Sequence, residues 1–245
     1  MVTATTAGAP TRRRHPFWQE TVLLLAAAMI LALVIKALFL QAFYIPSSSM
    51  EPGLVRNDRI LVEKPSYWLG GTPRRGDVVV FKDPGDWLPA DEVDRPTGTV
   101  TSLMARVGLF PSGGHLVKRV IGVAGDVITC CDDQGRIAVN GTPLDEDSYI
   151  APQRDCNGPM TDTCNWTAGP VPPGHIFVMG DNRDDSADST VHMCADTAVD
   201  CTPGDEYVDT HLVVGRVFAL VWPRDRITVL HRPATFASVG DPPDQ

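Results

Sequence analysis

Three serines follow a long apolar stretch and lie between two prolines, in the segment IPSSSMEP at residues 45–52. The prolines restrict the backbone on both sides. In an extended segment side chains alternate between two faces, so Ser47 and Ser49 share one face and Ser48 takes the other. One hydroxyl can then attack a substrate carbonyl while the second donates to the oxyanion. A polar turn beside the apolar stretch is the alternative interpretation.

Two adjacent cations interrupt an apolar strand pattern in the segment LVKRVIG at residues 116–122. Alternation places Lys118 and Arg119 on opposite faces, so one of them must point toward an apolar environment. Removal from water lowers the pKa of a lysine, whereas an arginine stays protonated. Lys118 can therefore become a general base near neutral pH, and Arg119 cannot. A solvated edge strand is the alternative.

A third polar segment, GDNRDDSADS at residues 180–189, directly follows an apolar run. Its side chains readily hydrogen-bond to their own backbone, which predicts a rigid turn. Such a turn can hold Ser186 against a neutral lysine and orient it. Closely spaced carboxylates also suit a calcium ion, but the segment lacks the glutamate that closes an EF-hand loop.

Other catalytic and metal-binding signatures are missing. The sequence has no H-E-x-x-H, G-x-S-x-G or S-x-x-K, no phosphate-binding loop and no dinucleotide fingerprint. A Ser-His-Asp triad assembled from distant histidines stays open. The six cysteines match no zinc pattern; Cys156 with Cys164 and Cys194 with Cys201 would each close a short loop, but all fifteen pairings stay open. We expect no metal ion and no cofactor.

The serines are preceded by an apolar stretch from Val22 to Leu40, interrupted only by Lys36. This stretch is long enough to cross a bilayer as one helix. Three arginines at residues 12–14 place the N-terminus in the cytoplasm and everything after the stretch outside. A cleaved signal peptide is the alternative, but residues 41–45 offer no small-x-small site. The stretch is predicted to be a retained membrane anchor.

Short runs rich in valine and isoleucine, separated by turn residues, predict a mostly β domain after the anchor. The runs lie at residues 59–62, 77–81, 116–123, 127–129, 137–139, 176–179 and 213–222. Asn140-Gly141 between two such runs predicts a hairpin. We expect an antiparallel, β-barrel-like domain with a small inserted cap lobe. Loop-like excursions at residues 83–114 and 145–174 are expected to be surface excursions or such a lobe, and not independent domains.

The predicted organisation has four parts. They are a basic cytoplasmic arm at residues 1–20, a transmembrane anchor at 21–43, an extracytoplasmic β domain at 44–231 and a C-terminal tail at 232–245 that is expected to fray. A chain of 245 residues that is 43% hydrophobic can bury one core and a small lobe. Its net charge of -9 argues against general nucleic-acid binding.

The order of these motifs resembles that of bacterial type I signal peptidases, a family of serine proteases with a Ser/Lys dyad. The resemblance rests on the apolar stretch followed by the blocks PSSSM at 46–50, RGDVV at 75–79, KRVIG at 118–122 and GDNRDDSADS at 180–189. It extends to residues 214–216 and 222–223. The sequence departs from the family in having Ser48 where many members have glycine and Thr190 where many have arginine.

The resemblance implies a role for each of the polar residues singled out above. Ser49 would be the nucleophile and Lys118 its general base, with Ser47 and the Ser49 backbone N–H forming the oxyanion hole. Ser186 would orient Lys118. Asp181 and Asp188 would hold the site together, with Arg119 as a partner of one of them.

The family also implies a substrate and a location. Its members are membrane-bound endopeptidases that remove signal peptides from exported preproteins after small residues at positions -1 and -3. The expected partners are such preproteins, the lipid bilayer and a nearby export translocon, with no nucleic acid.

Three alternatives stay open. One is a self-cleaving Ser-Lys protease of the repressor type, which the predicted anchor and the missing DNA-binding module oppose. Another is an inactive membrane-tethered binding relative, which the presence of both Ser49 and Lys118 opposes. The third is a dedicated processing peptidase of the same fold for a single substrate class, and the sequence does not separate it from a general signal peptidase.

Overall fold

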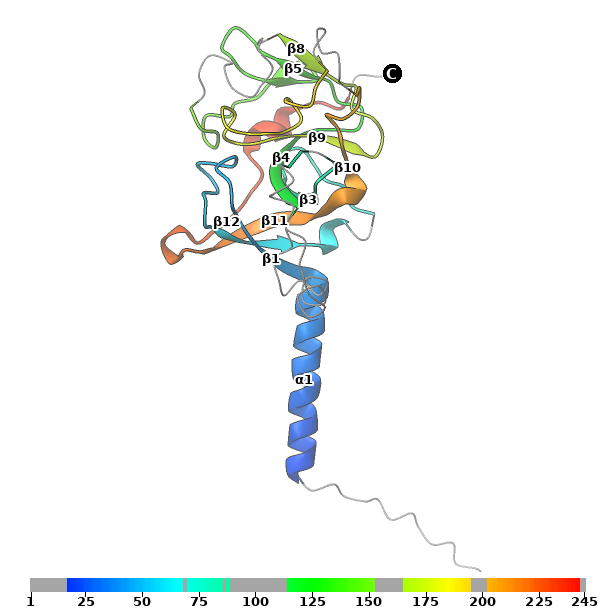
Figure 1. Cartoon of the computed structure of the whole chain (residues 1–245), viewed down its shortest axis with the longest axis vertical. Helices are drawn as coiled ribbons and strands as arrows, with labels where there is room; N and C mark the ends of the chain where they lie inside the picture. Colours follow the sequence, from blue (N-terminus) through cyan, green and yellow to red (C-terminus); the bar gives the residue numbers. More distant parts are fainter. Residues whose placement is uncertain are drawn as a thin grey trace, which may run out of the picture.

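A single long helix, α1 (Phe17–Phe39), extends from one end of a β-rich body (Figure 1). The computed structural model describes residues 17–67, 70–85, 87–88, 114–152, 165–194 and 202–242, apart from the side chains of residues 34–38. Most of the predicted arm at 1–20, most of the excursion at 83–114 and three cysteines lie outside the described residues.

The helix α1 follows from an almost unbroken run of apolar residues with good helix propensity. Large side chains such as Phe17, Leu23 and Leu24 are exposed along it and pack into no core. Counting only residues whose side chains are described, no helix is both long enough and apolar enough to span a membrane. The chain passes directly from Phe39 into β1 (Leu40–Tyr44), which occupies the last residues of the range 21–43 assigned to the anchor.

The main sheet is antiparallel and has the strand order β1-β2-β11-β3-β4-β9-β10, with β12 paired to β11. Its later strands are β2 (Arg59–Glu63), β3 (Val78–Lys82), β4 (His115–Val123), β9 (His175–Met179), β10 (Val208–Asp209), β11 (Val213–Trp222) and β12 (Thr228–Val229). The prediction of a mostly antiparallel β domain is confirmed. Within the described ranges the sheet is open, with β1 and β10 at its two ends.

A smaller sheet of order β7-β6-β5-β8 forms the accessory lobe, at the end of the body away from α1 (Figure 1). Its strands are β5 (Ile128–Cys130), β6 (Ala138–Val139), β7 (Thr142–Pro143) and β8 (Trp166–Ala168). The predicted hairpin is confirmed: Asn140 and Gly141 join β6 to β7 with φ values of 53° and 77°. The lobe includes residues from Ile128 onward as well as part of the excursion at 145–174, because β8 returns to pair with β5.

Alternation along the strands divides the core into separate clusters. Val78 and Val80 of β3 pack with Ile45 and Met50 in one cluster. Val79 of β3 faces the other way, into a cluster that contains Leu116, Val120 and Trp87. A third cluster joins the main sheet to the accessory lobe. Single-turn 3-10 helices complete the structure at Pro65–Tyr67, Thr210–Leu212, Arg224–Arg226 and Ala234–Ser238.

The C-terminal segment packs onto the domain as far as residue 242, and the prediction of a frayed tail from Arg232 is wrong for this part. Arg232 forms an ion pair with buried Asp77, with Nε 2.6 Å from the carboxylate. The ring of Phe236 is buried against Gly76, where an added Cβ would lie 2.7 Å from it. These contacts join positions that are far apart in the sequence, so composition near the chain end did not reveal them.

Two described cysteines, Cys130 and Cys131, form a disulfide with each other. Cys194 is also disulfide-bonded. Sequence spacing had left all pairings open.

Candidate active site

The serine loop, residues 47–52, is held by buried apolar neighbours on both sides. Ile45 before it and Met50 within it are almost fully buried. The backbone of Ile45 exchanges hydrogen bonds with residues 57 and 58, of 2.9 and 3.0 Å. Ser49 is only 6% exposed, and its Oγ lies 3.2 Å from Oγ of Ser47. The two hydroxyls therefore lie on one side, as predicted, although the segment forms a turn with a hydrogen bond from the Glu51 N–H to the Ser48 carbonyl and is not extended.

The serine loop docks on the acidic loop, residues 180–189. The backbone N–H of Asn182 donates to the Ser49 carbonyl at 3.0 Å, and its side-chain amide donates to the Ser48 carbonyl at 3.2 Å. The Ser48 hydroxyl, which points away from the Ser47 and Ser49 pair, donates to the Asp185 carboxylate. Four residues from two segments about 130 positions apart are thus joined by three hydrogen bonds.

Gly180 marks the closest approach of the two loops. A Cβ at this position would lie 2.4 Å from the Ser49 carbonyl oxygen and 2.3 Å from Oγ of Ser186. Only a residue without a side chain fits there. The Ser49 backbone and the Ser186 hydroxyl consequently lie against the same glycine.

Lys118 lies on β4 opposite Val79 of β3, and paired residues of an antiparallel ladder point to the same face. That face carries the cluster of Leu116 and Val120, and Lys118 is only 4% exposed. Burial lowers its pKa from 10.5 to about 8, although the charges of three nearby carboxylates in the acidic loop oppose the change. At pH 7 a lysine with this pKa is neutral in about one molecule in ten.

The carboxylates that act on Lys118 are Asp188, Asp185 and Asp181, in decreasing order of effect. Asp188 accepts the Ser186 hydroxyl at 2.5 Å, and Asp185 accepts the Ser48 hydroxyl. Lys118, the serine loop and the acidic loop therefore lie close together. Because Ser186 donates its O–H to Asp188, the lone pairs of its oxygen stay available to accept a hydrogen bond from the lysine.

Asp188 accepts four hydrogen bonds within the described residues, and none of them comes from an arginine. In addition to Ser186, it accepts the backbone N–H of Gly180 at 2.8 Å and both the N–H and the hydroxyl of Thr190, at 3.0 and 2.8 Å. Thr190, which departs from the family pattern, therefore supplies a polar contact to this buried carboxylate from a position next to it.

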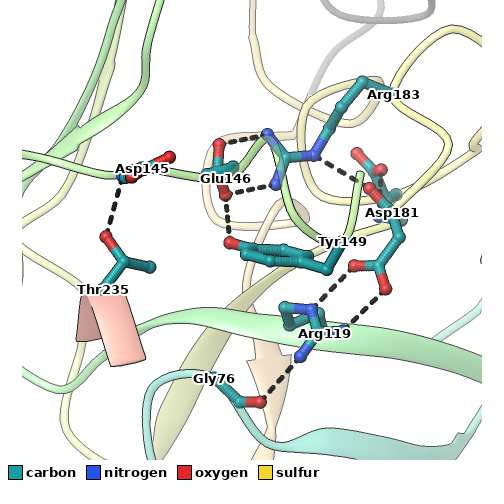
Figure 2. A network of polar contacts seen from close by, with 10 residues as sticks. Gly76, Arg119, Asp145, Glu146, Tyr149, Asp181, Arg183 and Thr235 are labelled. Atoms are coloured by element: carbon teal, nitrogen blue, oxygen red, sulfur yellow. Dashed lines mark hydrogen bonds and ion pairs between the residues drawn. The ribbon is translucent and has the colours of Figure 1, made fainter. Parts of the chain in front are cut away.

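Arg119 points away from Lys118 and pairs with Asp181. Two guanidinium nitrogens lie 2.7 Å from the two carboxylate oxygens, and a third donates to the Gly76 carbonyl at 3.0 Å (Figure 2). The guanidinium also lies over the ring of Tyr149, 4.4 Å from its centroid. Both charged groups are buried, so the pair fixes the start of the acidic loop on β4.

Sequence reasoning missed the continuation of this network. Glu146 makes a bidentate ion pair with Arg183, with distances of 2.8 and 2.6 Å, and accepts the Tyr149 hydroxyl at 2.6 Å (Figure 2). Arg183 in turn donates to the Gly180 carbonyl at 2.9 Å. Glu146 and Tyr149 belong to a segment of loop-like composition, where no spacing or periodicity identifies them.

The described part of the chain contains no group of three or more His, Cys, Asp or Glu side chains arranged to hold a metal ion. His192, the histidine that follows the acidic loop, stacks face to face on Trp87 with the ring centroids 4.3 Å apart. Burial lowers its pKa. The chemistry available at the site is that of hydroxyls beside a lysine that is partly neutral.

Comparison with known proteins agrees with this chemistry. The family model of signal peptidase, peptidase S26, matches residues 18–222. A signal peptidase I of Mycobacterium tuberculosis (strain CDC 1551 / Oshkosh) is 37% identical over 224 residues, which cover 85% of this chain and 74% of that protein. A probable signal peptidase I of Mycobacterium leprae (strain TN) is 36% identical, with coverages of 88% and 79%, and a probable signal peptidase I-2 of Synechocystis sp. (strain ATCC 27184 / PCC 6803 / Kazusa) is 34% identical, with coverages of 87% and 77%. With matches of this extent, the chain belongs to the signal peptidase family, peptidase S26, and is a serine endopeptidase.

Proposed function

We propose that this protein removes N-terminal signal peptides from exported preproteins, with Ser49 as nucleophile and Lys118 as general base. The observation that carries the proposal is the burial of Lys118, which lowers its pKa to about 8 next to the loop on which Ser49 docks. A lysine must be neutral before it can accept a serine proton. The burial supplies that neutral form near physiological pH.

The reaction follows from these positions. Neutral Lys118 takes the proton of Ser49 Oγ, which attacks the carbonyl carbon of the scissile bond. The lysine then gives this proton to the departing amine, and an acyl-enzyme remains. In the second half, Lys118 takes a proton from water, the resulting hydroxide attacks the ester, and Ser49 is released with its proton restored.

The oxyanion is stabilised by two donors on the serine loop. The Ser47 hydroxyl lies close to the nucleophile, with 3.2 Å between the two Oγ atoms. It therefore reaches the oxygen of a carbonyl that is attacked by Ser49, together with the Ser49 backbone N–H. Ser186 accepts a hydrogen bond from Lys118 and orients it, while Asp188 and the Arg119–Asp181 pair hold these groups in place.

We further infer that the chain is a single-pass membrane protein with its N-terminus in the cytoplasm and its β domain outside. The support is the apolar stretch from Val22 to Leu40, the arginines before it, and a helix of 23 residues, which is about 35 Å long. Confinement of enzyme and substrate to one bilayer raises their effective concentration. It also places the site beside the membrane, where the translocon delivers preproteins.

Cleavage of a purified preprotein tests the function. Wild type in detergent should cut a preprotein with an Ala-x-Ala site after the second alanine, as read by N-terminal sequencing of the product. Ser49→Ala and the isosteric Lys118→Met should leave it uncut, whereas Ser66→Ala, far from the site in sequence and exposed, should retain activity. A wild type that cuts only one native substrate, and not varied Ala-x-Ala preproteins, would point to the dedicated processing peptidase.

Extraction tests the anchor. Alkaline carbonate should leave the full chain in the membrane pellet. A protease added to intact spheroplasts should degrade the β domain. Release of the chain into the carbonate supernatant would contradict the anchor.

A further inference from the structure

We propose that Glu146 is a positioning residue for proteolysis, which holds the acidic loop and the serine loop in register from outside all the recognised motifs. The inference deepens the proposed function and rests on the roles given there to Ser49 and Lys118. It concerns the strap, residues 146–151, which connects the accessory lobe to both loops.

The strap contacts the acidic loop in two places. Glu146 forms the bidentate ion pair with Arg183, and both side chains are almost fully buried, at 4% and 0% exposure. Five residues later the N–H of Ala151 donates to the carbonyl of Asp181 at 2.9 Å. The two contacts hold the first part of the acidic loop, at Asp181 and Arg183.

The same strap contacts the serine loop. Ile150 forms an antiparallel β-bridge with Pro52, three residues after the nucleophile. The strap keeps its own shape through backbone hydrogen bonds from Tyr149 and Ile150 to the Glu146 carbonyl, of 3.0 and 3.2 Å. One short turn of chain is therefore in contact with the serine loop, which carries Ser49, and with the acidic loop, which carries Ser186.

Glu146 acts on the site through two arginines. Its carboxylate orients Arg183, whose Nε donates to the Gly180 carbonyl, and Gly180 contacts both the Ser49 carbonyl and Ser186. The carboxylate also accepts the Tyr149 hydroxyl, and the Tyr149 ring faces the guanidinium of Arg119 (Figure 2). Loss of the carboxylate would leave a buried guanidinium without its counter-charge beside Gly180.

Loss of the Glu146 carboxylate is expected to displace the groups of the site and to leave substrate binding unchanged. Displacement of Gly180 moves the Ser49 carbonyl and Ser186 together, and misplacement of reacting groups by about 1 Å can lower a rate by about a hundredfold. A loosened acidic loop also lets water reach Lys118. Because burial is the main cause of its lowered pKa, that pKa should rise toward the value in water.

The test compares Glu146→Gln with a matched control in the full-length protein. Glu146→Gln keeps the shape of the side chain and removes its charge; we expect kcat to fall about 10- to 100-fold with KM changed less than about twofold. The acidic limb of the kcat/KM profile should move to higher pH. Glu146→Asp should recover part of the loss.

Asp126→Asn is the control, because Asp126 is a fully buried carboxylate that pairs with Arg75 away from both loops. It should lower the thermal midpoint while leaving kcat and the pH profile unchanged. If Glu146→Gln does not fold, Tyr149→Phe decides: it removes one hydrogen bond to Glu146 and should lower kcat severalfold with the same movement of the acidic limb.

The outcomes separate the inference from the function on which it rests. The role of Glu146 alone is overturned if Glu146→Gln keeps full activity and an unchanged pH profile. If Glu146→Gln is unfolded, the same result in Tyr149→Phe overturns it. An equal loss of kcat in Asp126→Asn also overturns it, because the effect would then be general destabilisation. A wild type that does not cleave, or a Ser49→Ala variant that does, overturns the proposed function and this inference with it.

Discussion

Replacement of Lys118 by methionine should abolish proteolysis and at the same time stabilise the protein at neutral pH. The two side chains have similar lengths, and the site is almost closed to water. Wild type must hold an amine there whose pKa burial lowers from 10.5 to about 8. At about 1.4 kcal/mol per pH unit, the free energy of unfolding at pH 7 is reduced by roughly 3 kcal/mol.

The sign and the pH window follow from proton binding. The unfolded lysine keeps its proton up to pH 10.5 and the folded one only up to about 8, so the unfolded state binds more protons between these values. The stability of wild type therefore rises with pH across this window, and the full penalty is present below pH 8. Lys118→Met removes the penalty, so its advantage over wild type should shrink by roughly 2 to 3 kcal/mol between pH 7 and pH 10.

Urea unfolding of the full chain in detergent, followed by tryptophan fluorescence at pH 7 and pH 10, measures this difference. Lys82→Met is the control, because Lys82 is an exposed lysine on the adjacent strand β3. The free energy of unfolding of Lys82→Met relative to wild type should vary by no more than a few tenths of a kcal/mol between the two pH values. A stability difference for Lys118→Met that is the same at both pH values would refute the argument that burial depresses the lysine pKa.

Three further predictions concern the acidic loop. Asp185→Asn removes an exposed negative charge that raises the pKa of Lys118, so this pKa should fall. The acidic limb of the kcat/KM profile should then move below pH 8, and a shift to higher pH would contradict the sign of this interaction. Gly180→Ala places a methyl group 2.4 Å from the Ser49 carbonyl oxygen, and initial-rate assays should show a loss of about a hundredfold or more, whereas retention of wild-type kcat would contradict the close approach. Thr190→Val removes the hydroxyl that donates to buried Asp188 and should lower the free energy of unfolding by about 1 to 3 kcal/mol in urea titrations. An unchanged unfolding midpoint for Thr190→Val would show that this hydrogen bond is dispensable.

Local patterns in the sequence determined the strands and the residues that could take part in chemistry. Alternation along residues 116–123 placed Lys118 and Arg119 on opposite faces, and the structure has Lys118 paired with Val79 above an apolar cluster. The Asn140-Gly141 turn was recognisable because few residues adopt two successive positive φ values. Side-chain periodicity and turn chemistry act over a few residues, so they can be recognised in one short segment at a time.

Tertiary structure alone decided how these segments meet. The pairing of Glu146 with Arg183 spans 37 positions, and the docking of Ser48 on Asn182 spans 134. Neither has a periodic signal, because each depends on where two loops arrive after the sheet has formed. The same reason explains why the segment after Arg232 packs on the domain. The sequence thus determined which groups could react, whereas long-range packing decided the burial that lowers the pKa of Lys118.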